Sequence, residues 1–165
     1  GAGAGYGIAS GADNLALGLY AVGKGYLGVG TPGITGSYNT ALGNGTLTYL
    51  TSGSYNLAVG YNALGGATYA PTLGYNIGIG YLAGASITTG NYNVILGANN
   101  GASIATLSNH IIIADGQGNE RVRFNNAGNM TLAAIQEHAD NAAAVTAGLS
   151  VGTIYRTGDN LKIVH

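Results

Sequence analysis

The chain has 165 residues, of which 31 are Gly, 12 are Tyr and none is Cys or Trp, and its formal net charge is −1. The glycines follow no strict three-residue period, which excludes a collagen triple helix, and the 46% hydrophobic content favours a folded β structure over disorder. Only five residues are Lys or Arg, so we expect no nucleic-acid partner. Because no run of 18 apolar residues occurs, we also expect no membrane insertion.

The charges are unevenly distributed. Between Lys24 and Asp115 there is no Asp, Glu, Lys or Arg. Since a soluble monomer usually keeps charges on its surface, this stretch predicts a surface that is hidden in an assembly or solvated by hydroxyl and amide groups. The absence of Cys fits a protein that works outside the cell without disulfides. The chain opens on Gly1 with no visible secretory signal, and we expect it to be part of a longer protein.

A short unit recurs through the first hundred residues. It reads Gly-Ser-Tyr-Asn-Thr-Ala-Leu-Gly at 36–43 and Gly-Ser-Tyr-Asn-Leu-Ala-Val-Gly at 53–60, with related copies at 74–80 and 90–97. The Asn markers are 17, 20 and 17 residues apart. Such a period is typical of a solenoid, in which each unit buries its face on its neighbours. The structural repeat positions are Asn39, Ala41, Gly43, Asn56, Ala58, Gly60, Asn76, Gly78, Gly80, Asn93 and Gly97.

Alternation inside the unit predicts one short β-strand per repeat. The bulky Leu57 and Val59 alternate with the small Ala58 and Gly60, which is the period of two expected of a strand. We expect Leu57 and Val59 to fill the roll, and the small face to let another backbone or sheet approach closely. A packed ladder of tyrosines is expected along the roll, at positions 38, 55, 75 and 92.

In chain order, residues 1–106 are predicted to form the β-roll, with irregular rungs up to about residue 35 and a bulging loop within 61–73. Residues 107–132 are predicted to form a hairpin or meander with strands at 109–114, 120–124 and 130–132. The last part, 133–165, should hold one Ala-rich helix over 133–147, ended by Gly148, and two C-terminal strands. A narrow apolar seam on that helix suggests that it helps to cap a trimer; its residues are Ile135, His138, Ala142, Val145 and Leu149.

The repeat resembles two families of trimeric proteins. The Gly-Ser-Tyr-Asn-x-Ala-Val-Gly-Tyr-Asn-Ala-Leu pattern over about 36–101 is similar to the YadA-like heads of trimeric autotransporter adhesins, and it looks closer still to repeats of phage tail fibres and tailspikes. The segment 114–124 with the following Gly128-Asn129, and the segment 140–158, also resemble phage structural proteins. Gly at 78 and Ile at 95 depart from the repeat's Ala, which leaves the packing of those rungs open.

The resemblance implies a mainly β protein: a homotrimer of left-handed parallel β-rolls in the virion tail, outside the cell. It implies binding to a host cell-surface glycan or outer-membrane receptor near the distal tip, and contact with other tail proteins through an N-terminal part that this sequence lacks. The alternative is the head of a bacterial trimeric adhesin. A third possibility is a spacer that binds nothing, whose C-terminal part aligns the three chains.

The residues suggest no catalytic, metal or cofactor site. The segment 23–28 matches the Gly-x-Gly-x-x-Gly spacing of dinucleotide-binding loops, but such matches arise by chance in a Gly-rich chain and no βαβ unit follows. The carboxylates form no recognisable acid–base pair, so we expect no enzyme activity. The segment 115–119 lacks calcium-loop spacing and is predicted to be a turn. The three His residues are scattered; copies of His138 could meet on a three-fold axis, but a packed or solvent-facing His is favoured.

Among the tyrosines outside the repeating Tyr-Asn step are Tyr49, Tyr61 and Tyr69. Aromatic faces with Asn and Thr beside them suit sugar rings, through stacking and hydrogen bonds to hydroxyl groups. We therefore predict receptor binding by these residues together with Asn62, chiefly in the interruption at 61–73.

Overall fold

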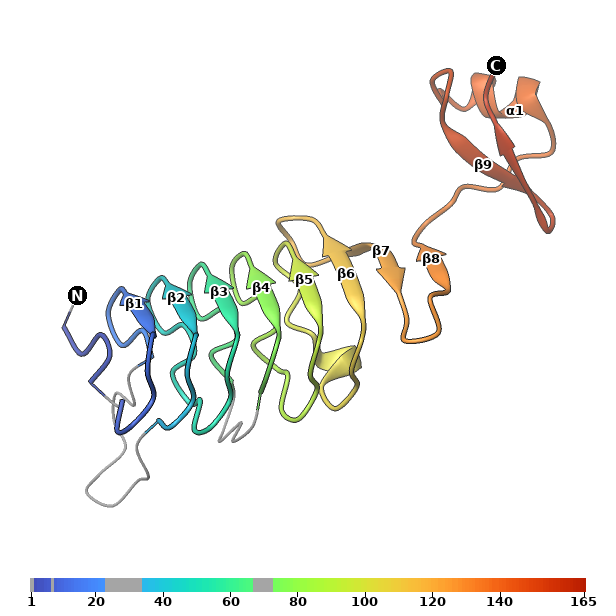
Figure 1. The fold of residues 1–165 in the computed structure, drawn as a ribbon. Helices are drawn as coiled ribbons and strands as arrows, with labels where there is room; N and C mark the ends of the chain where they lie inside the picture. The colour runs from blue at the N-terminus through green and yellow to red at the C-terminus, as the bar shows by residue number, and fades with distance from the viewer. Residues whose placement is uncertain (1, 7, 23–33, 67–72) are drawn as a thin grey trace. The chain divides into compact units, whose positions relative to one another are not determined.

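The computed structural model describes residues 2–6, 8–22, 34–66 and 73–165 and is mainly β (Figure 1). The chain forms two compact units, Gly1–Thr131 and Leu132–His165. The first is a β-solenoid, as the repeat predicts. The Gly-rich segment 23–28 and the part of the expected loop at 67–72, which includes Tyr69, lie outside the described residues.

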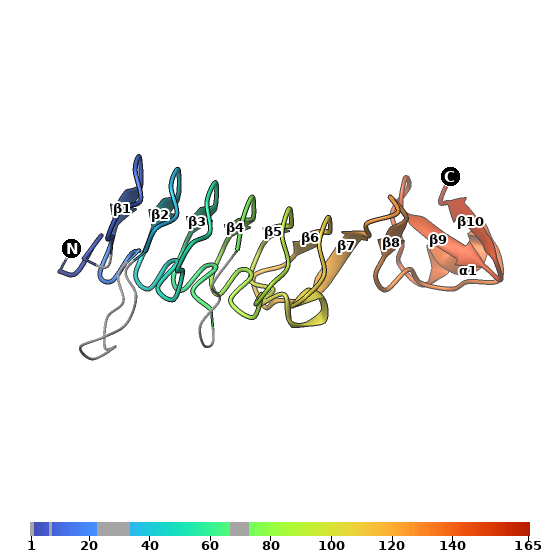
Figure 2. The ribbon, with the colours of Figure 1, turned by 60° about the horizontal axis from the view of Figure 1, so that its bottom comes forward.

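The solenoid carries one short strand on each turn of the chain. The strands are β1 (Leu15–Leu17), β2 (Thr40–Leu42), β3 (Leu57–Val59), β4 (Ile77–Ile79), β5 (Val94–Leu96) and β6 (Ile111–Ala114). Each pairs in parallel with the next, so that Ala58 is in register with Ala41 and Gly78. Figures 1 and 2 both show these strands following one another in a single row.

The inward-facing residue of each strand is the central one, which contradicts the orientation expected from residue size. Ala58 is completely buried, whereas Leu57 and Val59 are half-buried on the outer side. The roll is too narrow for large side chains at that point. A Cβ added to Gly78, the equivalent of Ala58 on β4, would lie 2.9 Å from Cγ of Leu64 in the turn of the neighbouring rung.

Large core side chains come mainly from the turns rather than from the strands. Each fully buried Leu or Ile contributes about 1.5–3 kcal/mol through removal of apolar surface from water. These turn residues include Leu47, Leu50, Leu64, Leu73, Ile87 and Ile104.

The departure of position 95 from the repeat is accommodated inside the roll. Ile95 is fully buried, and its Cδ1 lies 2.9 Å from where a Cβ on Gly101 would stand and 3.5 Å from where one on Gly84 would stand. Because glycine has no side chain, Gly84 and Gly101 leave space that the Ile95 side chain fills, and the rung stays closely packed.

A ladder of buried asparagines runs along the interior. The side-chain Oδ1 of Asn39 accepts from the backbone N–H of Asn56, and that of Asn56 accepts from Asn76, both at 3.0 Å. The Nδ2 of Asn56 donates to the carbonyl of Leu73 at 2.8 Å. Each Asn thus satisfies polar backbone groups that its turn leaves unpaired inside the core. The ladder ends where His110 donates its N–H to Asn93.

Beyond the roll the sheet turns antiparallel, which confirms the predicted meander. Strand β6 pairs with β7 (Glu120–Phe124), and β8 (Met130–Leu132) follows it in the same sheet. Residues 115–119 form the predicted turn between β6 and β7, in which Gly118 donates to the carbonyl of Asp115. A short 3-10 helix, η1 (Ala102–Ile104), precedes β6 and was not expected from the sequence.

The second unit corrects the predicted helix. Helix α1 spans only Asn141–Thr146, starting at the Asp140 cap, so the expected seam over 133–147 does not exist. Residues 133–134 form a turn, and residues 136–138 bridge to the later strand instead of joining the helix: His138 donates its N–H to the carbonyl of Arg156, and Arg156 donates to that of Gln136. Strands β9 (Ile154–Thr157) and β10 (Asn160–Ile163) form the predicted C-terminal hairpin.

The core of this second unit is small. It consists of Ala144 of α1 with Tyr155 and Val164, and Leu149 packs against them. Among the described residues, no helix has the length and apolarity needed to span a membrane.

Candidate functional site

Aliphatic side chains cover the outer face of the β1–β6 sheet. They make up the residues that flank the buried centre of each strand, except for the polar Thr40 on β2, and none of them is charged. Leu17 is 62% exposed and Ile79 and Ile113 are about 40% exposed in the single chain. An apolar surface that continues over several strands is unusual on a monomer and marks an interaction site. We call these flanking residues the outer sheet face: Leu15, Leu17, Leu42, Leu57, Val59, Ile77, Ile79, Val94, Leu96, Ile111 and Ile113.

The repeating tyrosines form the predicted packed ladder along the roll, and this ladder lies on the surface. Tyr38, Tyr55, Tyr75 and Tyr92 stack with ring centroids 4.8–4.9 Å apart and are each about half exposed. Their backbones have φ near +60°, which turns the chain just before each strand. Because each inner ring covers its neighbours' faces, this ladder offers ring edges and hydroxyl groups rather than a flat stacking surface.

Of the predicted receptor-binding residues, Tyr61 lies in a second, shorter ladder. Its ring stacks on that of Tyr81 with centroids 5.6 Å apart, and Asn62 follows it at φ +52°. Tyr49 is half-buried, and within the described part of the chain no ring contact or side-chain hydrogen bond joins it to Tyr61 or Asn62. Among the described residues of the predicted set, Tyr49 therefore does not join Tyr61 and Asn62 through such a contact.

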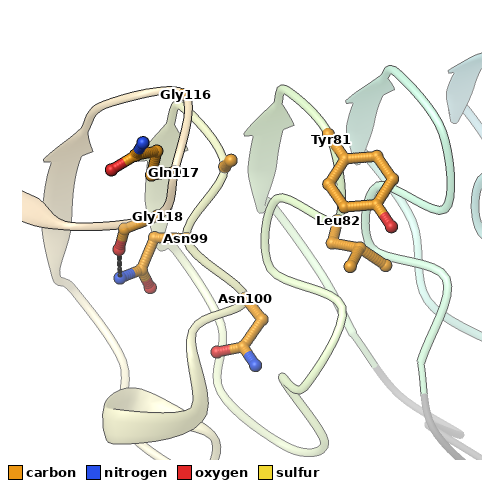
Figure 3. A pocket seen from close by; sticks show the side chains of 8 residues that line it. Tyr81, Leu82, Asn99, Asn100, Gly116, Gln117 and Gly118 are labelled. Carbon is orange, nitrogen blue, oxygen red and sulfur yellow. Dashed lines mark hydrogen bonds between the residues drawn. The ribbon is translucent and has the colours of Figure 1, made fainter.

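Beside Tyr81 the surface is hollowed. A groove of about 340 Å³ lies between the turn after β4 and the β6–β7 turn. Figure 3 shows Tyr81 and Gln117 on opposite sides of this groove. One wall is held together by a hydrogen bond in which the Nδ2 of Asn99 donates to the carbonyl of Gly118 at 3.0 Å. No charged side chain lines it.

This groove was not expected from the sequence, although a periodic signal for it exists. The residue after each repeat glycine occupies one column of the surface, and from Gly43 onward that column reads Asn44, Tyr61, Tyr81, Ala98. The groove opens at the position where the tyrosines stop.

Ionisable groups gather instead at the β6–β7 hairpin. Asp115 accepts from the side-chain amide of Asn119 at 3.1 Å and from Arg121 at 2.6 Å. Arg123 pairs with Glu120, also on the hairpin. Among the described residues no three His, Asp or Glu side chains come together as metal ligands. His138 lies with its ring edge on Tyr155, 6.1 Å between centroids.

The Asp115 turn should depend on pH. The hydrogen bond from Asn119, followed by the Arg121 contact and backbone N–H groups, holds the pKa of Asp115 well below its ordinary 3.8. A lowered folded-state pKa means that the ionised form stabilises the turn; this stabilisation is complete above the ordinary value and is lost as pH falls below it. Carboxyl NMR titration should therefore give a midpoint below 3.8, and Arg121→Gln should move it upward. An ordinary midpoint in the wild type would contradict the observed contacts.

We compared the chain with known proteins and found no relative. No protein-family model, no curated protein and no solved structure matches this chain.

Proposed function

We propose that the chain is a non-enzymatic structural and adhesion protein: a segment of a phage tail fibre or tailspike that acts outside the cell on the virion. It assembles as a homotrimer of left-handed β-rolls and binds a host cell-surface receptor, for which a glycan is the favoured class. Further tail proteins attach through parts of the fibre beyond this segment.

The observation that carries the proposal is the outer sheet face. Leu17, Ile79 and Ile113 leave an apolar surface that continues along the whole row of strands in one chain. The same surface on a second and third copy is its natural partner, since repeated units offer identical, evenly spaced rungs. The lack of charge from Lys24 to Asp115 fits burial of this surface, because no charge loses its hydration on assembly.

Assembly is tested by placing a charge on the outer sheet face. We expect Ile79→Glu to raise the dissociation constant of the trimer at least about 100-fold, because an unpaired carboxylate would be buried among aliphatic side chains. Analytical ultracentrifugation should give three times the mass of one chain for the wild type. The matched control is Leu107→Glu, at a residue of similar exposure that lies outside the sheet, and it should leave the trimer intact. A stable wild-type monomer would refute the assembly.

Adhesion is tested separately on intact host cells. The labelled wild-type protein should bind cells that carry complete surface glycans and should lose binding to mutants with truncated glycans. Equal binding to all mutants would point to a protein receptor. Binding to matrix protein alone would support the adhesin-head alternative, and the absence of any binding would support a spacer.

A further inference from the structure

We propose that the groove beside Tyr81 is a binding slot for one uncharged sugar ring, which completes the stack that Tyr61 and Tyr81 begin. This inference rests on the proposed attachment function, because it names the class of ligand and the place where the ligand binds. No residue predicted from the sequence lies in the groove itself, although Tyr61 supports one of its walls.

The first reason is the interrupted ladder. Tyr61 covers one face of the Tyr81 ring, with 14° between the ring planes, and Tyr81 remains 59% exposed. The rung that follows has Ala98 in the same column, so that rung supplies no aromatic ring to stack on the opposite face. A flat ring lying over Ala98 would therefore make the stacking contact that the next rung of the protein does not supply.

The second reason is the polarity of the remaining walls. Asn100 uses its Oδ1 to accept from the N–H of Ala102, and within the described residues its Nδ2 has no protein acceptor. Gln117 stands across from Tyr81, and its Nε2 is likewise without a protein acceptor in that part of the chain. One aromatic face with amide donors around it is the combination that recognises a ring bearing hydroxyl groups.

The third reason is charge and size. No charged side chain lines the groove, and Asp115 and Arg121 on the adjoining hairpin are paired with each other, so the groove offers no opposing charge to an ionised ligand. An acidic or basic sugar would lose hydration without compensation. The volume of about 340 Å³ lies at the small end of the ~300–1,000 Å³ range of ligand sites, which suits one ring rather than an extended chain.

The test uses saturation-transfer NMR on the full chain with free glucose, galactose, rhamnose and N-acetylglucosamine, and with glucuronate as the charged probe. At least one neutral sugar should give a signal with the wild type, and glucuronate should bind more weakly. Tyr81→Ala removes the stacking face and should weaken binding about tenfold. Ala98→Tyr should abolish it, because the new ring continues the ladder and fills the slot.

The matched control is Asn44→Tyr, which extends the same column beyond Tyr61 at its other end and leaves the groove open. This control should bind sugar within twofold of the wild type. Ala98→Tyr and Asn44→Tyr both add a stacked ring, so circular dichroism should show the wild-type fold in each. Two results would overturn the assignment: no neutral sugar binds the wild type, or binding survives in Ala98→Tyr.

Cell binding separates this inference from the proposed function. If the wild type binds cells but no neutral sugar gives a signal, the groove assignment fails and the attachment function stands. If sugars bind and Ala98→Tyr abolishes that binding while the wild type does not attach to cells, the groove assignment stands and the attachment function fails.

Discussion

Replacement of Asn56 by alanine is expected to lower the free energy of unfolding of the solenoid by about 2–6 kcal/mol, because two buried backbone groups lose their partners. These groups are the N–H of Asn76, which donates to Oδ1 of Asn56, and the carbonyl of Leu73, which accepts from its Nδ2. Asn56 is only 2% exposed, so water has little access to replace either bond. Urea denaturation followed by circular dichroism measures the change.

Two further variants make the Asn56 experiment specific. Asn126→Ala, at an exposed position in the β7–β8 turn, should change the stability by less than about 0.5 kcal/mol. Asn56→Asp keeps the size of the side chain but replaces the donor by a buried carboxylate, and should be at least as destabilising as Asn56→Ala. If Asn56→Ala had the stability of Asn126→Ala, the ladder would not support the fold.

Replacement of Gly60 by alanine should destabilise the roll by at least about 3 kcal/mol, since it combines backbone strain with a collision. Gly60 has φ +118°, and a Cβ there would stand 2.5 Å from the carbonyl oxygen of Gly80 on the next rung. Thermal unfolding of the variant should show a lower midpoint together with reduced cooperativity of the rungs.

Two control variants, at glycines with no atom nearby, distinguish the effect of backbone strain from the effect of the collision. Gly128 has φ +79°, and a Cβ there would have no atom within 4 Å, so Gly128→Ala should lower the free energy of unfolding by only about 1–2 kcal/mol. Gly116→Ala has neither a positive φ nor a close neighbour and should be nearly neutral. If Gly60→Ala cost no more than Gly128→Ala, the rungs would have room to move apart.

The chain from residue 111 onward illustrates the limits of local pattern. The strands at 120–124 and 130–132 follow from alternating residues between turn sequences, and they form where they were predicted. The helix predicted over 133–147 shrinks to Asn141–Thr146 because residues 136 and 138 bond to Arg156, almost twenty residues away. An Ala-rich composition favours a helix, but it carries no information about a strand that arrives later in the chain.

The candidate site likewise combines a feature that the local sequence predicts with one that depends on contacts between distant residues. The column of Tyr61, Tyr81 and Ala98 is present in the sequence, and its period can be read there. The wall opposite Tyr81 comes from Gln117 in the β6–β7 turn, and only the fold brings that turn beside the end of the column. Tyr49, which was predicted because it lies outside the repeating Tyr-Asn step, does not line the groove.

The period, the strand in each repeat and hence the solenoid follow from the amino-acid order, because Asn and Gly must recur wherever rungs stack backbone on backbone. Which face of each strand is buried depends instead on the folded surroundings. Ala58 lies inside and Leu57 and Val59 lie outside because the turn residues, Leu64 among them, already fill the narrow interior. Residue size predicts the opposite orientation, since alternation identifies two faces but not the width of the space that each one meets.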